Sequence, residues 1–285
     1  MNFHIISWNI RGLCNPLKQR AIRKLSSKKV VKLLLIQETK MEKNRINVLR
    51  CLWGSKVGDF AESPAVGLSG GLISIWDKEF FNAEKVIVDH RFLILEGELI
   101  LWKKKIAVIN VYAPNCEADR KQWFEQLANV LENVGRPIIL GGDLNSILSP
   151  DEKVGAAFSK SSSLQLLNFI NRLNLINLPL SGGKFTWFGR SAPPQASRID
   201  RFCISPDLLL MWTDIQQSVL ARNLSDHCPI SLVVECKKST PKPFKWFNSW
   251  GEAEGYSELI KMTVASFGKL DIGEVLKACK VQSKI

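Results

Sequence analysis

Four short polar segments of the sequence carry side chains that could bind a metal ion or a phosphate. They are SWNIRG with Asn9, QET with Glu38, GGDLN with Asp143 and Asn145, and SDHCP with Asp226 and His227. Carboxylate and amide oxygens are the ligands that Mg²⁺ prefers, so Glu38 with Asn9 would suit one such ion. Asp143 and Asn145 are two residues apart on a segment expected to be extended, which predicts that their side chains point the same way. His227, one of three histidines, could stabilise negative charge on a phosphate.

Each of these residues also has an ordinary structural explanation. Asp143 follows two glycines and could cap a turn. Glu38 could be a solvated carboxylate, and a single histidine is more often structural than catalytic. Taken together, however, the four segments all lie where an apolar run meets a polar one. Because strand ends at one rim of a sheet can direct separate side chains to one point, we predict a shared site.

The elements that must position these residues are predicted to be strands interleaved with helices. Apolar runs and alternating patterns predict strands at 3–8, 32–37, 71–76, 85–88, 92–99, 105–112, 137–140, 184–188, 198–204 and 229–236. Helical spacing predicts helices at 16–29, 42–52, 119–134, 161–173 and 206–212. This order is typical of two packed sheets flanked by helices.

A change in composition near the C-terminus predicts a domain boundary. The basic, proline-containing segment KKSTPKP begins at residue 237, which is typical of a linker. We therefore expect one domain at 1–236, followed at 237–285 by the linker and a partial helical tail too short for a core of its own.

The overall composition indicates a globular protein with a polyanionic partner. Apolar residues make up 46% and charged residues 23%, and the net charge is +12, which favours nucleic acid as the partner. Seven cysteines without a C-x-x-C pair indicate reduced thiols rather than disulfides or a zinc cluster. With no signal peptide and no apolar run long enough to span a bilayer, we expect an intracellular protein, nuclear or cytoplasmic, that is neither secreted nor bound to a membrane.

Six motifs in a fixed order resemble a known superfamily. The strings are SWNIRG, LIQETK, NVYAPN, GGDLN, SRIDRF and SDHCPI. They are similar to the endonuclease/exonuclease/phosphatase superfamily, the deoxyribonuclease I-like group that includes exonuclease III and the abasic-site endonucleases. Within it, GGDLNSILSPDEKVG and INLPLSGGKFTWFGR resemble most the endonuclease domain of LINE-type retrotransposons, especially those of plants. In such elements a reverse transcriptase follows, and the tail resembles a truncated start of the segment between the two.

The resemblance implies a fold and a set of residue roles. The fold would be a four-layer α/β sandwich of two mixed β-sheets packed face to face with flanking helices. Asp143 would orient or deprotonate the attacking water, and Asn145 would position that water or the phosphate. His227, held by Asp200, would stabilise the charge on the phosphoryl oxygens, and Asp226 would add to the metal site or help the leaving group. The full implied set is catalytic Asp143, Asn145, His227, Asp200 and Tyr112; metal-binding Glu38, Asn9 and Asp226; and, in contact with phosphate or DNA, Thr186 and Ser225. We also expect a DNA contact from Arg11 and from Trp187, which lies beside the Gly182-Gly183 turn and could equally pack against the protein.

The implied function is a Mg²⁺-dependent endonuclease, with Mn²⁺ as an alternative ion, that acts as a monomer on DNA. It would nick the strand and leave 3′-hydroxyl and 5′-phosphate ends. Abasic-site endonucleases commonly carry an acidic residue where this chain has Arg11, which argues against abasic-site repair. Two alternatives stay open: the same fold acting on another phosphodiester or phosphomonoester, and a catalytically silent relic that only binds nucleic acid.

Overall fold

The computed structural model describes residues 2–235 except positions 29, 43–45, 55–57, 68, 191 and 213, together with Glu258 and Lys261. The chain divides into two compact units, Met1–Lys237 and Lys238–Ile285. The tail predicted for 237–285 lies outside the described residues apart from those two, and it stays a prediction. None of the helices in the described part is long and apolar enough to cross a membrane.

Seven strands form the first sheet, in the order β11-β15-β16-β1-β2-β4-β3. Their bounds are β1 Asn2–Asn9, β2 Val31–Gln37, β3 Gly58–Val66, β4 Ser69–Asp77, β11 Leu180–Ser181, β15 Ile215–Val219 and β16 Ile230–Glu235. Strands β1 and β2 run parallel, with Asn9 opposite Gln37. Because parallel strands end at the same edge of a sheet, Asn9 and Glu38, the residue after β2, lie side by side at that edge.

Six strands form the second sheet, in the order β10-β14-β8-β7-β6-β5. Their bounds are β5 Phe81–Val88, β6 Phe92–Leu99, β7 Lys104–Tyr112, β8 Ile138–Asp143, β10 Ile176–Asn177 and β14 Asp200–Ile204. In the pairing of these strands, Asp143 lies opposite Tyr112 on β7 and opposite Asp200 on β14. Three predicted site residues therefore occupy neighbouring positions at one edge of this sheet.

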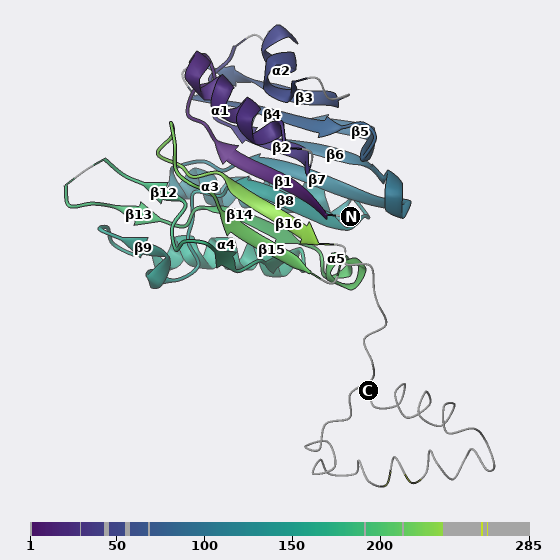
Figure 1. Ribbon diagram of the computed structural model, residues 1–285. Helices are drawn as coiled ribbons and strands as arrows, with labels where there is room; N and C mark the ends of the chain where they lie inside the picture. The colour runs from purple at the N-terminus through teal and green to yellow at the C-terminus, as the bar shows by residue number, and fades with distance from the viewer. Residues whose placement is uncertain are drawn as a thin grey trace. The chain divides into compact units, whose positions relative to one another are not determined.

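The two sheets pack face to face between two layers of helices (Figure 1). The core between the sheets includes Phe3 and Leu35 from the first sheet and Val108 and Phe202 from the second. The outer face of the first sheet packs against α1, Pro16–Ser26, and α2, Ile46–Trp53. The outer face of the second sheet packs against α3, Glu117–Glu132, and α4, Lys160–Arg172. The predicted four-layer α/β sandwich is confirmed.

A small third sheet and three short helical turns complete the described fold. The third sheet has the order β12-β13-β9, with β9 Lys153–Val154, β12 Trp187–Phe188 and β13 Ala196–Ser197. The turns are η1 Ile100–Trp102, η2 Pro150–Glu152 and α5 Pro206–Met211. Residue 187 also forms an isolated antiparallel bridge with His227, so the small sheet reaches the edge where the site residues gather.

Several predicted elements differ from the observed ones. The strand predicted at 92–99 has the observed bounds, whereas the strand predicted at 184–188 shrinks to the two residues of β12. Strands β3 and β15 were not predicted. The sequence of β3, GDFAESPAV, contains a proline, and that of β15, IQQSV, is mostly polar; neither has the strong apolar pattern that indicates a strand.

Candidate active site

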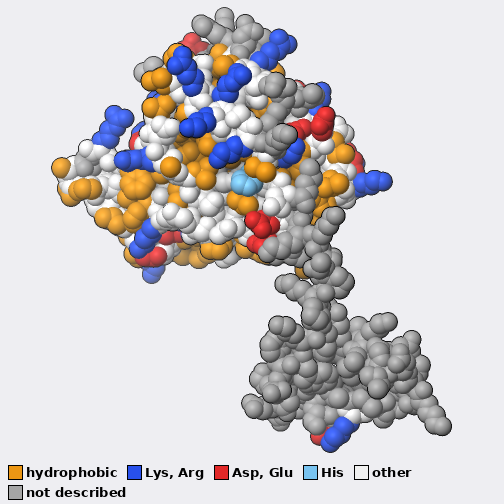
Figure 2. Space-filling view, in the orientation of Figure 1, with side chains coloured by type: hydrophobic (Ala, Val, Ile, Leu, Met, Phe, Trp, Pro, Cys, Tyr) orange, Lys and Arg blue, Asp and Glu red, His pale blue; other side chains and the backbone are white. Residues whose placement is uncertain are grey.

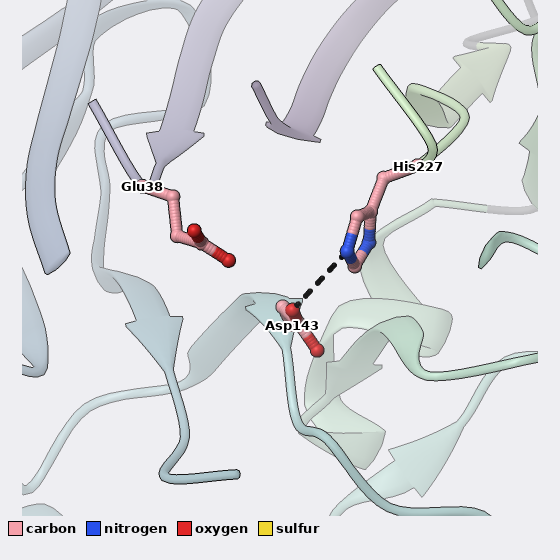
Figure 3. Close-up of side chains that lie close together, drawn as sticks. All are labelled: Glu38, Asp143 and His227. Atoms are coloured by element: carbon pink, nitrogen blue, oxygen red, sulfur yellow. Dashed lines mark ion pairs between the residues drawn. The ribbon is translucent and has the colours of Figure 1, made fainter. Parts of the chain in front are cut away.

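Three titratable side chains from distant parts of the sequence converge at the rim of the two sheets. Ligand atoms of Glu38, Asp143 and His227 all lie within 4.8 Å of one another, and the three residues are buried. Figure 3 shows Glu38 and His227 reaching from either side toward Asp143. Glu38 follows β2 of the first sheet, Asp143 ends β8 of the second, and His227 precedes β16 of the first. The donor atoms are therefore supplied by both sheets.

Asn9 connects the two carboxylates of this group. Its Nδ2 donates one hydrogen bond of 2.9 Å to Glu38 Oε1 and another of 2.9 Å to Asp143 Oδ2. Its Oδ1 accepts from the backbone N–H of Arg11 at 3.2 Å. Asn9 therefore orients both carboxylates, and its oxygen keeps a second lone pair. Its predicted part in metal binding stays a prediction.

His227 is held in place by three neighbours. Its Nδ1 lies 3.0 Å from Asp200 Oδ2, and its Nε2 lies 3.8 Å from Asp143 Oδ2. Its backbone carbonyl accepts a 3.0 Å hydrogen bond from the indole N–H of Trp8. With a carboxylate on Nδ1, the Nε2 edge of the ring is the one directed at Asp143, as the predicted pair of His227 and Asp200 requires.

The pKa values of Asp143 and His227 are both raised above their ordinary values. Burial raises the pKa of Asp143 to about 7, and the nearby carboxylate of Asp200 adds to the effect. Burial alone would lower the pKa of His227, but the carboxylates of Asp200, Asp143 and Asp226 outweigh it and raise this pKa to about 9. At neutral pH the imidazole is therefore largely cationic, and Asp143 is poised to take up or release a proton.

Tyr112 lies at the end of β7, opposite Asp143 in the strand pairing. Burial, followed by the carboxylates of Glu38 and Asp143, raises the pKa of its phenol. The guanidinium of Arg91 lies over the ring, 5.1 Å from its centroid. The phenol therefore stays neutral, and its hydroxyl donates a hydrogen bond to Glu38. Its predicted donation to a phosphate oxygen stays a prediction.

Asn145 is close to the site but not in the conformation predicted from its spacing. Its φ is +46°, so the chain turns left-handed instead of continuing as a strand. Its backbone N–H donates to Asp143 Oδ1 at 2.9 Å, and its Nδ2 donates to the carbonyl of Ala113 at 2.8 Å. The expectation that Asn145 lies on an extended segment is wrong, because of this turn. Its predicted role at the site stays a prediction.

Two residues predicted to contact phosphate or DNA are buried within the protein. Thr186 is fully buried, and its Oγ1 accepts from the backbone N–H of Asp200 at 3.0 Å. Ser225 is 7% exposed, donates to the carbonyl of Asn9 at 2.8 Å and accepts from the backbone N–H of His227 at 3.2 Å. The predicted contacts do not fit this burial. Instead, the two hydroxyl groups bind backbone groups of Asp200, Asn9 and His227.

Asp226 is turned toward two other predicted contact residues rather than toward the metal-binding group. It forms an ion pair with Arg11 and accepts a 3.1 Å hydrogen bond from the indole N–H of Trp187. Asp226 is outside the set of Glu38, Asp143 and His227 that could hold an ion. The metal role predicted for Asp226 therefore does not fit this arrangement, because its carboxylate is already paired with Arg11.

The sequence interpretation gave no role to Gln37 and Asn110, which join the two sheets directly beneath the site. Gln37 Nε2 donates to Asn110 Oδ1 at 2.7 Å and to Ser7 Oγ at 3.0 Å. Asn110 Nδ2 donates to the carbonyl of Ile73 at 3.0 Å and to Ser74 Oγ at 3.2 Å. Both amides are fully buried. A polar residue inside an apolar strand, as in LLLIQ and AVIN, was the signal available for them.

The residues at this site fit a divalent cation with a preference for oxygen ligands. Glu38 and Asp143 offer two buried carboxylates, and the nearest cationic atoms to Glu38, Arg11 Nε and Lys40 Nζ, are 3.8 and 3.9 Å away. Asp143 has the imidazole of His227 at 3.8 Å, so in the described part of the chain neither carboxylate has a cationic atom within hydrogen-bonding distance. Buried carboxylates in this situation are costly unless a further cation compensates them. Carboxylate oxygens suit Mg²⁺ or Mn²⁺, so Glu38 and Asp143 are the residues that would hold it.

Comparison with known proteins identifies the family. Residues 6–227 match the Endonuclease/Exonuclease/phosphatase family, and the chain belongs to this family of nucleases and phosphatases. It is 30% identical over 165 residues to the transposon TX1 uncharacterized 149 kDa protein of Xenopus laevis, a match that covers 55% of this chain. The chain spans only 12% of the length of that relative.

Solved structures confirm the fold. The endonuclease domain of TRAS1, a telomere-specific non-LTR retrotransposon, matches 83% of this chain and 100% of its own, with 17% identity and a TM-score of 0.60. An AP endonuclease from Archaeoglobus fulgidus covers 82% of this chain and 99% of its own, with 17% identity and a TM-score of 0.65. The Neisseria 3′ phosphatase NExo, bound to a product DNA hairpin, covers 86% and 100%, with 19% identity and a TM-score of 0.64. The transposon relative and TRAS1 support the predicted resemblance to retrotransposon endonucleases.

Proposed function

We propose that residues 1–236 form a Mg²⁺-dependent endonuclease, able to use Mn²⁺, that nicks DNA and leaves 3′-hydroxyl and 5′-phosphate ends. We also propose that it derives from a retrotransposon. The observation that carries the proposal is the convergence of Glu38, Asp143 and His227 within 4.8 Å, supplied by two different sheets. Such a group combines a place for a cation, a proton acceptor and a fixed positive charge.

The side chains of the site divide the work of phosphodiester hydrolysis. A divalent cation bound by Glu38 and Asp143 would neutralise phosphoryl oxygens and the leaving oxygen. Asp143, whose pKa burial raises to about 7 when no ion is bound, takes the proton of the attacking water. The imidazolium of His227, kept cationic and oriented by Asp200, stabilises the charge that builds on the phosphoryl oxygens. Tyr112 donates to a phosphate oxygen.

The substrate proposed is DNA because the chain as a whole is basic and a basic helix follows the Asn9 segment of the site. The net charge is +12, and α1, which follows the Asn9 segment, has the basic sequence PLKQRAIRKLS. Lys and Arg side chains gather over the region of α1 and α2 on the face drawn in Figure 2. Positive charge along a surface attracts the phosphate backbone. We propose that the protein acts on this substrate as a monomer.

Conversion of supercoiled plasmid to open circles tests the proposal directly. We expect nicking with Mg²⁺, none with excess chelator, and a loss of at least ~10²-fold in rate for Glu38→Ala, Asp143→Ala and His227→Ala. DNA ligase should reseal the nicks, because ligation requires a 3′-hydroxyl beside a 5′-phosphate.

Glu79→Ala is the matched control for the carboxylate changes. Glu79 is an exposed acidic residue in the turn between β4 and β5. Since β4 runs antiparallel to β2, this turn lies at the opposite end of the sheet from Glu38, and the rate should not change. Site variants that nick as fast as the native protein would disprove the site assignment.

The two alternatives give different results in the same set of assays. Phosphate release from inositol phosphates without plasmid nicking would favour another phosphoester as substrate. DNA binding that persists in chelator, with no nick accumulating in Mg²⁺ or Mn²⁺, would favour a catalytically silent relic.

A further inference from the structure

Left-handed backbone conformations are concentrated around the carboxylate of Glu38. Six non-glycine residues of the described chain have positive φ angles, and four belong to the site: Arg11, Glu38, Lys40 and Asn145, with φ of 47°, 48°, 55° and 46°. This conformation is unfavourable for residues with a side chain, so it persists only where the surrounding structure enforces it. The surrounding structure therefore holds the backbone of Arg11, Glu38 and Lys40 in this conformation.

The loop that carries Arg11 is fixed by hydrogen bonds on all sides. The backbone N–H of Arg11 donates to Asn9 Oδ1 at 3.2 Å, and its carbonyl accepts from Lys18 Nζ at 2.7 Å. The next residue, Gly12, donates its N–H to the carbonyl of Glu38 at 2.7 Å. The backbone that presents the Arg11 side chain is thus tied to the backbone that presents Glu38.

The guanidinium of Arg11 lies against two carboxylates. It forms an ion pair with Asp226 through Nη1, and its Nε lies 3.8 Å from Glu38 Oε1. On the other side of Glu38, Lys40 Nζ lies 3.9 Å from Oε2. The carboxylates of Asp226 and Glu38 therefore contact the same guanidinium from two of its nitrogens. A divalent cation is also bound by carboxylates in proteins, and here a permanent organic cation lies between them.

We propose that the guanidinium of Arg11 takes the place of a second divalent cation. The site then binds a single ion, on the side of Glu38 that faces Asp143, and Arg11 supplies the second positive charge. This inference concerns the metal site of the proposed function and rests on it. A guanidinium does not lose its proton in proteins and is part of the chain. This second positive charge is therefore present at any concentration of free metal.

The position of Arg11 leaves its charge accessible to a substrate. Its side chain is 44% exposed, and it lines a cavity of about 340 Å³ together with Lys18, Trp187, Arg190 and Asp226. A guanidinium can donate to a carboxylate and a phosphate at once, since it has five N–H groups in a planar fork. Arg11 can therefore keep its ion pair with Asp226 while it contacts a phosphoryl oxygen.

Counting bound ions in the absence of DNA tests this inference. Mn²⁺ is titrated into the purified full chain while the electron paramagnetic resonance signal of free Mn²⁺ is recorded. We expect the native protein to bind one equivalent and Arg11→Asn to bind two. Asparagine tolerates the left-handed backbone and removes the positive charge. Should Arg11→Asn fail to fold, Arg11→Gly also suits this backbone and should give the same count.

Three further variants make the count specific. Arg11→Lys keeps the charge and should still bind one equivalent. Adding Asp226→Asn to Arg11→Asn removes one of the two carboxylates, so the second equivalent should be lost. Lys103→Asn is the matched control: Lys103 is also a left-handed cation, with φ of 49°, but it lies in the turn after η1, away from the site residues, and its variant should bind one equivalent.

Two results would overturn the inference: two equivalents bound by the native protein, or one equivalent bound by folded Arg11→Asn and Arg11→Gly. The plasmid assay separates this failure from that of the proposed function. If the native protein nicks DNA and binds two ions, the proposed function is supported and the inference about Arg11 is wrong. If the native protein does not nick DNA but the number of bound ions rises from one to two on loss of Arg11, the proposed function is wrong and the inference about Arg11 is supported.

Discussion

The two flanks of Asp143 balance their charges in different ways. On one flank, His227 has 4% of its side chain exposed and pairs with Asp200 at 3.0 Å. On the other, the cationic atoms nearest Glu38 among the described residues are Arg11 Nε at 3.8 Å and Lys40 Nζ at 3.9 Å, beyond hydrogen-bonding distance, and these two side chains are 44% and 42% exposed. The histidine flank is neutralised within the protein, whereas the glutamate flank has room for an added cation. The positive charge beside Asp143 on the histidine flank is therefore supplied by the protein, whereas the glutamate flank would take up a divalent cation from solution.

The largest expected effect is on catalysis at the histidine flank, compared with metal binding at the glutamate flank. Asp200→Asn should reduce plasmid nicking by ~10²–10⁴-fold, because the imidazole loses the carboxylate that orients it and keeps it cationic. The same change should leave the affinity for Mn²⁺ almost unaltered. Glu38→Gln should instead weaken Mn²⁺ binding by at least ~10-fold, since it removes a charged ligand. Calorimetric Mn²⁺ titration beside the plasmid assay measures both.

An equal loss of Mn²⁺ affinity in Asp200→Asn and Glu38→Gln would show that the flanks are not separate. Excess Mn²⁺ provides a second check. It should restore part of the activity of Glu38→Gln and none of that of Asp200→Asn.

The second prediction concerns a buried ion-pair cluster behind the histidine flank. Glu152 accepts hydrogen bonds from Arg198 at 3.1 Å and from Arg201 at 3.0 Å, and Arg201 precedes Phe202 on the strand that begins with Asp200. Burial alone would raise the pKa of Glu152, but the two arginines outweigh it and hold this pKa below 4.5, the ordinary value. Glu152→Gln should lower the free energy of unfolding by about 3 kcal/mol at neutral pH, because it leaves Arg201 buried without its anion.

The pH dependence of this effect follows from the sign of the pKa shift. A carboxyl group with a lowered pKa contributes stability that is fully present above its ordinary value of 4.5 and is lost as the pH falls through the folded-state pKa. The difference between native protein and Glu152→Gln should therefore shrink as the pH drops below that value. Urea unfolding at a series of pH values measures it, and a difference independent of pH would refute the assignment.

The smallest effect is expected beneath the glutamate flank, where Gln37 and Asn110 join the two sheets. Asn110→Leu leaves the amide of Gln37 without its 2.7 Å partner and should cost about 1–3 kcal/mol in the free energy of unfolding. Because Gln37 precedes Glu38, Mn²⁺ affinity should fall as well. The double variant Gln37→Leu with Asn110→Leu should be more stable than Asn110→Leu alone.

Asn82→Leu is the matched control for this change. Asn82 is an exposed residue of β5, and the free energy of unfolding should change by less than ~0.5 kcal/mol. If Asn110→Leu proves as harmless as Asn82→Leu, the pair of amides does not support the site.

The layers of the fold could be predicted from the sequence because the main strands are strongly apolar. The strand predicted at 32–37 is β2, Val31–Gln37, and the one at 105–112 is β7, Lys104–Tyr112. Strand β15, IQQSV, escaped prediction because a hydrogen bond, rather than apolar contacts alone, joins it to the core: Gln217 accepts from the backbone N–H of Phe202 at 2.6 Å. Such a pairing depends on residues that are distant in sequence.

The site residues could be predicted by type and motif, but not all of their roles. Glu38, Asp143 and His227 converge because strand ends meet at one rim. Thr186 and Ser225 were expected at a DNA contact, and in the structure their hydroxyl groups bind backbone groups of Asp200 and Asn9. A motif gives the kind of side chain. Burial decides whether that side chain faces the substrate or the protein.

The division of the donor atoms between two sheets has a consequence for the protein as a whole. Asn9 Nδ2 already bridges the halves, with hydrogen bonds of 2.9 Å to Glu38 and 2.9 Å to Asp143. An ion shared by these carboxylates would act as a cross-link that only the folded chain can form. Ligands that bind only the native state stabilise it by mass action, so the supply of divalent ions would set the persistence of the folded sandwich as well as its readiness to cut.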